Sequence, residues 1–276
     1  MRALLAAARP LQWSKNLLVF AGILFAAEYD DAWRWGAALV AFAAYCAASS
    51  AAYLLNDVVD AEADRLHPLK RNRPVASGEL PQRRALVASG LLAVGSFALV
   101  AGFGWPSAAY MAGFLALQVA YSVVLKRVVL IDVMAIAGLF VIRAAAGAEI
   151  VDVRISPWLI VCTALLALFL ALAKRRSELV SGGEGRGYSL TLVDQLVSVV
   201  AAATIVAYCL YTFEAREGSA MMATIPFVVF GIFRYLLLMH REQLGEEPER
   251  VLLTDVPILV TVALWALTSA VILGTT

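Results

Sequence analysis

The segment from residue 56 to 78, NDVVDAEADRLHPLKRNRPVASG, sets acids and bases side by side directly after a long apolar stretch. Three of its acids, Asp57, Asp60 and Asp64, recur every three or four residues and follow Asn56. If a helix continues through residue 64, these four side chains fall within about 100° of its circumference. Three carboxylates on one face repel one another, and a divalent cation would relieve that repulsion.

Oxygen ligands without a nearby His/Cys set favour Mg²⁺, with Mn²⁺ as the second choice, over zinc. We therefore predict a metal site at Asn56, Asp57, Asp60 and Asp64, with the three aspartates as catalytic residues. A basic run follows and is predicted to bind phosphate groups through Lys70, Arg71 and Arg73. Pro68 and Pro74 are expected to end the helix and turn this run back over the acids. Acids that hold metal beside bases that hold phosphate suit a diphosphate ester.

A solvated cytoplasmic loop is the alternative interpretation, because positive charge accumulates on that side of membrane proteins. It accounts for Arg83 and Arg84, which we assign to topology. It does not account for three carboxylates on one helical face.

Composition predicts an all-α membrane protein. Of the 276 residues, 62% are hydrophobic and 16% are charged, well below the quarter or so that is typical of soluble domains. Apolar stretches long enough to cross a bilayer recur along the chain. We expect nine transmembrane helices, near 14–28, 34–55, 83–104, 106–125, 129–149, 156–173, 190–213, 221–240 and 252–274.

The Lys and Arg residues concentrate in alternate links between these spans, which predicts the orientation. The N-terminus and the links 56–82, 174–189 and 241–251 are expected to be cytoplasmic, and the C-terminus outside. The first span is expected to be a retained helix, since no signal-peptide cleavage pattern follows it.

Polar residues within or beside other spans are further candidates for substrate binding. Asp132 and Arg143 lie 11 residues apart in the fifth span and share a helical face, toward either a cavity or neighbouring helices. Lys126 ends the fourth span and serves either substrate or topology. The remaining candidates are Tyr121, near the end of the fourth span, and Lys15 and Asn16, at the start of the first.

The stretch AKRRSEL after the sixth span offers one acid among three bases. Such a set is a poor metal site and a good phosphate site. We select Lys174, Arg175 and Glu178 as substrate-binding candidates. The glycine-rich SGGEGRG at 181–187 is expected to order when the donor binds.

The motif N-D-x-x-D-x-x-x-D at 56–64, with its basic segment, resembles the first aspartate motif of the UbiA superfamily of intramembrane prenyltransferases. The resemblance covers most of the chain. It implies one transmembrane domain over 1–276, a helical barrel around a central polar cavity with a cytoplasmic cap, and Mg²⁺ at the motif. Members of the family usually carry a second aspartate motif after span six, which AKRRSEL replaces here.

The stretches RPLQWSKNLLVFAG (9–22) and AKRRSEL (173–179) resemble the subgroup that makes polyprenyl-phosphoryl phosphoribose. That resemblance implies transfer of phosphoribose from 5-phosphoribosyl 1-diphosphate to a polyprenyl (decaprenyl) monophosphate in the cell membrane, toward cell-wall arabinan. Lipid is thus an expected partner and nucleic acid is not. The alternatives are a polyprenyltransferase acting on an aromatic or other acceptor, and a transporter or lipid-binding protein without chemistry. Which base holds which phosphate stays open, as does the oligomeric state.

Overall fold

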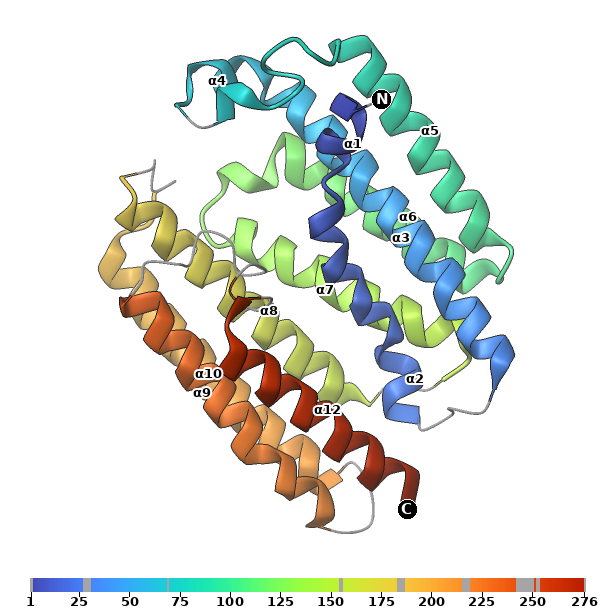
Figure 1. The fold of residues 1–276 in the computed structure, drawn as a ribbon, viewed down its shortest axis with the longest axis vertical. Helices are drawn as coiled ribbons and strands as arrows, with labels where there is room; N and C mark the ends of the chain where they lie inside the picture. Colours follow the sequence, from blue (N-terminus) through green and yellow to red (C-terminus); the bar gives the residue numbers. More distant parts are fainter. Residues whose placement is uncertain are drawn as a thin grey trace. The chain divides into compact units, whose positions relative to one another are not determined.

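The computed structural model describes residues 2–26, 31–68, 70–153, 156–182, 187–214, 219–241, 251 and 254–275. Throughout these ranges the chain forms helices and connecting turns without a strand, so the predicted all-α class is confirmed (Figure 1). The elements are α1 Arg2–Ala8, η1 Pro10–Phe20, α2 Ala21–Ala26, α3 Ala32–Val59, α4 Ala61–Leu66, η2 Lys70–Asn72, α5 Gln82–Ala101, α6 Trp105–Val123, η3 Leu125–Arg127, α7 Ile131–Ile150, α8 Pro157–Val180, α9 Leu190–Glu214, η4 Ser219–Thr224, α10 Ile225–Arg241 and α12 Val256–Thr275.

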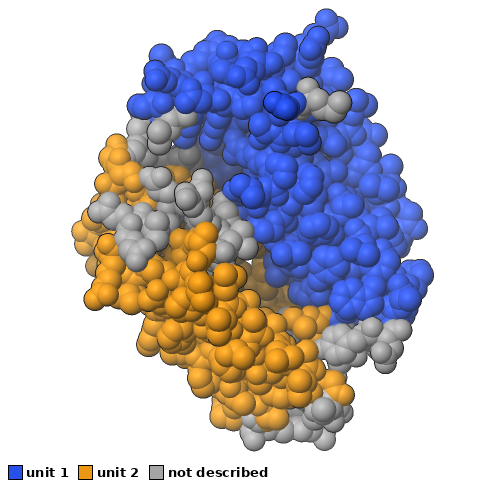
Figure 2. Space-filling model, in the orientation of Figure 1, with its two compact units in different colours: residues 1–23, 30–127, 142–153 blue, residues 24–29, 128–141, 154–276 orange. Residues whose placement is uncertain are grey.

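The chain divides into two compact units (Figure 2). Unit 1 comprises residues 1–23, 30–127 and 142–153, and unit 2 comprises 24–29, 128–141 and 154–276. Helix α7 contributes its first half to unit 2 and its second half to unit 1. The single domain that the sequence suggests stays a prediction.

Helix α3 is the longest element of unit 1 and carries the acidic motif at its C-terminal end. Asp31 caps its start by accepting hydrogen bonds from the backbone N–H groups of Trp33 and Arg34. Buried alanines along the helix, including Ala38, Ala41 and Ala44, let α1, η1, α5 and α6 pack against it. The motif therefore sits on a helix fixed by many neighbours.

Polar side chains of α3 also fasten the N-terminal segment. Trp13 donates to the Ser50 hydroxyl, and Asn16, fully buried, donates to Cys46 Sγ and accepts from Ser49. The segment η1 is an 11-residue 3₁₀ helix, well beyond the three or four residues usual for that geometry. These side-chain bonds thus hold an uncommon backbone in place.

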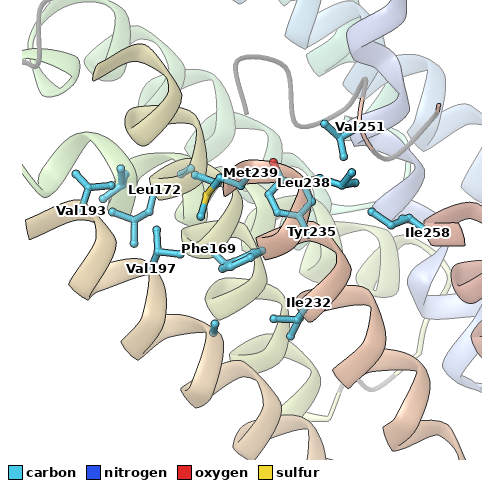
Figure 3. Packing of buried hydrophobic residues seen from close by; sticks show 14 of the residues in the cluster. Phe169, Leu172, Val193, Val197, Ile232, Tyr235, Leu238, Met239, Val251 and Ile258 are labelled. Atoms are coloured by element: carbon cyan, nitrogen blue, oxygen red, sulfur yellow. The ribbon is translucent and has the colours of Figure 1, made fainter. Parts of the chain in front are cut away.

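Unit 2 is built around a hydrophobic core shared by α8, α9, α10 and the start of α12 (Figure 3). Phe169 of α8 meets Tyr235 of α10 edge-on, with ring centroids 5.3 Å apart. Leu172, Val193 and Val197 pack in the same cluster. This core fixes the end of α8, on which the basic turn after the sixth predicted span lies.

Seven helices in the described part of the chain are long and apolar enough to cross a membrane, so this is a multi-pass membrane protein. They match the second, third and fifth to ninth predicted spans. The first predicted span, 14–28, corresponds to the 3₁₀ helix η1, which ends at Phe20, and to the short α2 that follows it directly, and it stays a prediction. The fourth predicted span is α6, with 19 residues, whose Gln118 and N-terminal Trp-Pro-Ser lower its hydropathy. The count of nine and the central cavity stay predictions. Residues 183–186 of the glycine-rich stretch lie outside the described residues.

Candidate active site

The acidic motif does not lie on one uninterrupted helix, so that expectation is wrong. Helix α3 ends at Val59, α4 begins at Ala61, and Asp60 between them has φ −94° and ψ 3°. The N–H groups of Asp60 and Asp64 still donate to the carbonyls of Asn56 and Asp60, at 2.9 and 2.8 Å. The chain therefore keeps turning with helical periodicity, and the motif residues fall into two groups, Asp57 with Asp64 and Asn56 with Asp60.

The first group is Asp57 and Asp64, joined by Arg73. The Arg73 Nη1 atom lies 2.7 Å from Asp64 Oδ2 and 3.5 Å from Asp57 Oδ1. Helix α4 ends at Leu66, ahead of Pro68, and the following loop brings Arg73 back. The predicted return of the basic run over the acids is thus confirmed for Arg73. Asp57 Oδ1 also accepts from Arg9 Nη2 at 2.5 Å, and Arg9 lies over the Tyr53 ring.

The second group is Asn56 and Asp60, which face Lys126. The Lys126 ammonium donates to Asp60 Oδ1 at 2.6 Å and to Asn56 Oδ1 at 3.0 Å. Asn56 Nδ2 in turn donates to the other oxygen of Asp60, at 3.1 Å. Lys126 is only 8% exposed and comes from η3, so it is directed inward at the motif and does more than anchor a span end.

Each motif carboxylate therefore meets a cation from a different part of the chain. Within the described residues, no set of three His, Cys, Asp or Glu side chains is gathered as a metal site. One atom does offer a ligand: Asp57 Oδ2 is buried and makes no hydrogen bond. The oxygens of Asp57, Asp60, Asp64 and Asn56 suit Mg²⁺ chemically, so the donor set fits a divalent cation that exchanges with the basic partners.

A second charged cluster lies in unit 2, where α7 begins and α8 ends. Arg175 Nε is 3.0 Å from Asp132 Oδ2, and Arg175 Nη1 contacts Glu178 Oε2 one turn further along α8. The Tyr188 hydroxyl donates to Asp132 Oδ1 at 2.6 Å. Burial, aided by this hydrogen bond, raises the pKa of Tyr188 to about 12.

The neighbouring Arg176 has a different environment. Its Nε lies 2.6 Å from Asp194 Oδ1 of α9, and its Nη1 donates to the Met239 carbonyl of α10. Arg176 thus ties three helices together, whereas Arg175 sits in a buried group of polar side chains.

The comparisons with known proteins decide the family. Residues 16–256 match the UbiA prenyltransferase family. The chain belongs to this family.

Relatives and solved structures within the UbiA family agree over nearly the whole chain. The chain is 36% identical to a decaprenyl-phosphate phosphoribosyltransferase of Mycolicibacterium smegmatis, over 91% of this chain and 86% of the relative. It is 31% identical to the enzyme of that name from Corynebacterium glutamicum, over 95% and 84%. The structure of a UbiA homologue from Archaeoglobus fulgidus, bound to DMAPP and Mg²⁺, superposes with a TM-score of 0.77 at 18% identity, covering 99% of both chains.

The other predicted substrate residues of this UbiA protein have varied environments. Arg143 lies in the part of α7 that belongs to unit 1, with its guanidinium 4.8 Å from the centre of the Phe114 ring. Lys15 donates to Gln12 within η1, and Asn16 anchors η1 to α3. The side chains of the remaining four candidates are partly buried or exposed, and these are Lys70, Arg71, Tyr121 and Lys174.

Two residues of these clusters escaped the sequence analysis. Arg9 opens the quoted RPLQWSKNLLVFAG stretch but is not among the predicted site residues. Its left-handed backbone, with φ 52°, aims the side chain at Asp57. Tyr188 follows the glycine-rich stretch, and the one sequence feature that marks it is an aromatic residue directly after these glycines.

Proposed function

We propose that this UbiA protein transfers 5-phosphoribose from 5-phosphoribosyl 1-diphosphate to a polyprenyl, here decaprenyl, monophosphate and releases diphosphate. The similarity to decaprenyl-phosphate phosphoribosyltransferases along the whole chain carries the proposal. The charges support it, because a sugar diphosphate with a second phosphate and a lipid phosphate needs many cations.

The motif residues would bind the donor's diphosphate. Asp57, Asp60, Asp64 and Asn56 would hold Mg²⁺, or Mn²⁺ in its place, which supplies positive charge to the leaving diphosphate. Arg9, Arg73 and Lys126 already meet these acids, so on donor binding they can turn to its phosphate oxygens.

The bond change requires no general base from the protein. An anionic oxygen of the lipid phosphate forms a bond to C1 of the ribose while the bond from C1 to the diphosphate oxygen breaks. The electron pair leaves with the diphosphate, and the configuration at C1 inverts. The chain's own task is to place two anions on opposite faces of one carbon and to screen their repulsion. Lys70, Arg71, Arg143, Lys174 and Arg175 are the further cations proposed for that task, with Lys15, Asn16, Tyr121, Asp132 and Glu178 around them.

We place this reaction at the cytoplasmic side of the cell membrane, because the motif link and the α8 link carry most of the basic residues. Nine spans would put the C-terminus outside. The polyprenyl tail would extend between helices into lipid. These features follow from the charge pattern and from the family resemblance.

The proposal is tested with the purified protein in detergent and two labelled donors. Label from [¹⁴C]phosphoribosyl diphosphate should enter the organic phase only when decaprenyl phosphate and Mg²⁺ are present. Transfer from labelled prenyl diphosphate to a small acceptor would replace this function with prenyl transfer. Turnover of neither donor, in protein that unfolds cooperatively, would favour a transporter or lipid-binding protein.

A further inference from the structure

The cluster in unit 2 is a continuous row of polar side chains in the order Tyr188, Asp132, Arg175 and Glu178. Three of its members are nearly inaccessible: Asp132 is 1% exposed, Arg175 4% and Tyr188 6%. A buried ion pair costs desolvation energy and is weak evidence for a purely stabilising role. The details of its geometry indicate what else it does.

The backbone fixes the direction of the Tyr188 hydroxyl. The N–H of Leu130 donates to that oxygen at 2.8 Å, so the phenolic proton is left for Asp132. Leu130 has a left-handed backbone with φ 68°. Gly187, with φ 85°, lies so close to Val129 that a Cβ would come within 2.8 Å of Val129 Cγ2. The pair Gly187–Tyr188 is thus docked closely on the start of α7.

This hydrogen bond sets how Asp132 meets Arg175. The two ions are 3.0 Å apart, yet neither Asp132 Oδ2 nor Arg175 Nε makes a hydrogen bond, because the N–H is not directed at the oxygen. The ion pair alone therefore does not fix the plane of the guanidinium. The Tyr188 hydroxyl and the backbone N–H of Val133, the latter at 2.8 Å, both donate to Oδ1, which keeps Oδ2 turned toward Arg175, while Glu178 holds Nη1.

Among the described residues, these contacts leave Nη2 of Arg175 without a partner. A guanidinium that is hydrogen-bonded at Nη1 and lies against a carboxylate at Nε presents Nη2 as a donor, which suits an anionic oxygen. Arg176, by contrast, is bound through Nε to Asp194 and through Nη1 to a carbonyl, and it links helices.

We propose that Tyr188 and Asp132 are positioning residues that aim Nη2 of Arg175 at a phosphate oxygen of a substrate. This inference rests on the proposed function, in which Arg175 binds one of the two phosphate-bearing substrates. Tyr188 itself touches no substrate and acts only through Asp132 and Arg175.

The test is a double-mutant cycle with Tyr188→Phe and Arg175→Met, measured as KM for each substrate and as kcat. One neutral hydrogen bond contributes about 0.5–1.5 kcal/mol, so Tyr188→Phe should raise KM for one substrate by about 2- to 10-fold, with a smaller change in kcat. In the Arg175→Met background the same change should add nothing. Equal effects of Tyr188→Phe in both backgrounds, or an unchanged KM, would overturn the proposal.

Tyr208→Phe is the matched control. It also removes a buried hydroxyl with two side-chain partners, here Thr224 and Trp265, neither of which belongs to the cluster. It should leave both KM values as in the wild type. Asp132→Asn is the second variant. It should raise KM for the same substrate as Tyr188→Phe does, so the proposal can still be tested if one of the two proteins folds poorly.

A direct binding readout separates this inference from the proposed function. Wild-type protein that transfers no label from phosphoribosyl diphosphate refutes the function. The rise in Tm produced by inorganic phosphate, the group that Arg175 is proposed to bind, then remains as the measurement. Tyr188→Phe and Asp132→Asn should both reduce that rise, while Tyr208→Phe should not. An undiminished rise in the two cluster variants would refute the positioning role.

Discussion

The two charged clusters are built in opposite ways. In unit 1 the acids come from one short motif, and their cations come from three places: Arg9 of the N-terminal segment, Arg73 of the loop after the motif and Lys126 of η3. In unit 2 the cations come from one short turn of α8, and two of their acids arrive from elsewhere, as Asp132 of α7 and Asp194 of α9. The first arrangement keeps acids together and the second keeps bases together.

We expect different ligands in the two regions. Three motif aspartates lie within eight residues and would repel one another if their cations moved away, so this region should favour a divalent cation. Lys174, Arg175 and Arg176 follow one another, which should favour an anion. A metal in unit 1 and a phosphate in unit 2 are the ligands that this contrast predicts.

The largest expected effect separates the two clusters by their dependence on metal. Asp60→Asn removes a motif charge and should lower kcat/KM by about 100- to 1,000-fold, with a higher Mg²⁺ midpoint. Glu178→Gln should cost less than about 10-fold, because Glu178 only braces Arg175, and should leave the midpoint unchanged. Activity titrations with Mg²⁺ measure both. A large shift of the Mg²⁺ midpoint in Glu178→Gln would show that unit 2 binds metal, and the two clusters would then not differ in their ligands.

Much of the motif region could be predicted from the sequence because its information is local. The spacing of Asp57, Asp60 and Asp64, the prolines after them and the apolar stretch before them all lie within one segment. That is enough to predict α3 and the return of Arg73. The interruption at Asp60 was missed, because helical periodicity continues through it and no Gly or Pro marks it.

The long-range partners were harder to predict because tertiary packing decides them. Lys126 lies 66 residues beyond Asp60, and its position at the end of a predicted span allowed a topological role as well. Arg9 depends on a left-handed backbone that its sequence does not announce. The first predicted span shows the same limit, since apolar composition predicts a span at 14–28 but not the 3₁₀ geometry of η1.

An intermediate effect is expected for the missed arginine of unit 1. Arg9→Ala removes a charge-assisted contact to Asp57 and, as proposed, a cation for the donor diphosphate. Since the Arg9 side chain is 29% exposed, the expected rise in donor KM is at the lower end of the range for such contacts, about 10-fold. Arg2→Ala, at the exposed start of α1, is the control for lost positive charge. Equal KM values in the two variants would place Arg9 outside the donor site.

The smallest effect concerns stability at high pH and tests whether Tyr188 is held as a neutral donor in unit 2. Burial and the Asp132 hydrogen bond raise the pKa of Tyr188 from 10.0 to about 12. A pKa that is higher in the folded state means that the folded protein binds the proton more tightly than the unfolded chain. The stabilisation is therefore complete below pH 10 and disappears as the pH rises toward about 12.

Tyr188→Phe has no such proton, so the difference in Tm between wild type and Tyr188→Phe should narrow between pH 9 and pH 11 in detergent. A difference between wild type and Tyr188→Phe that stays constant from pH 9 to 11 would show that the Tyr188 proton is not bound more tightly in the folded protein, and would leave Asp132 without the partner that orients it.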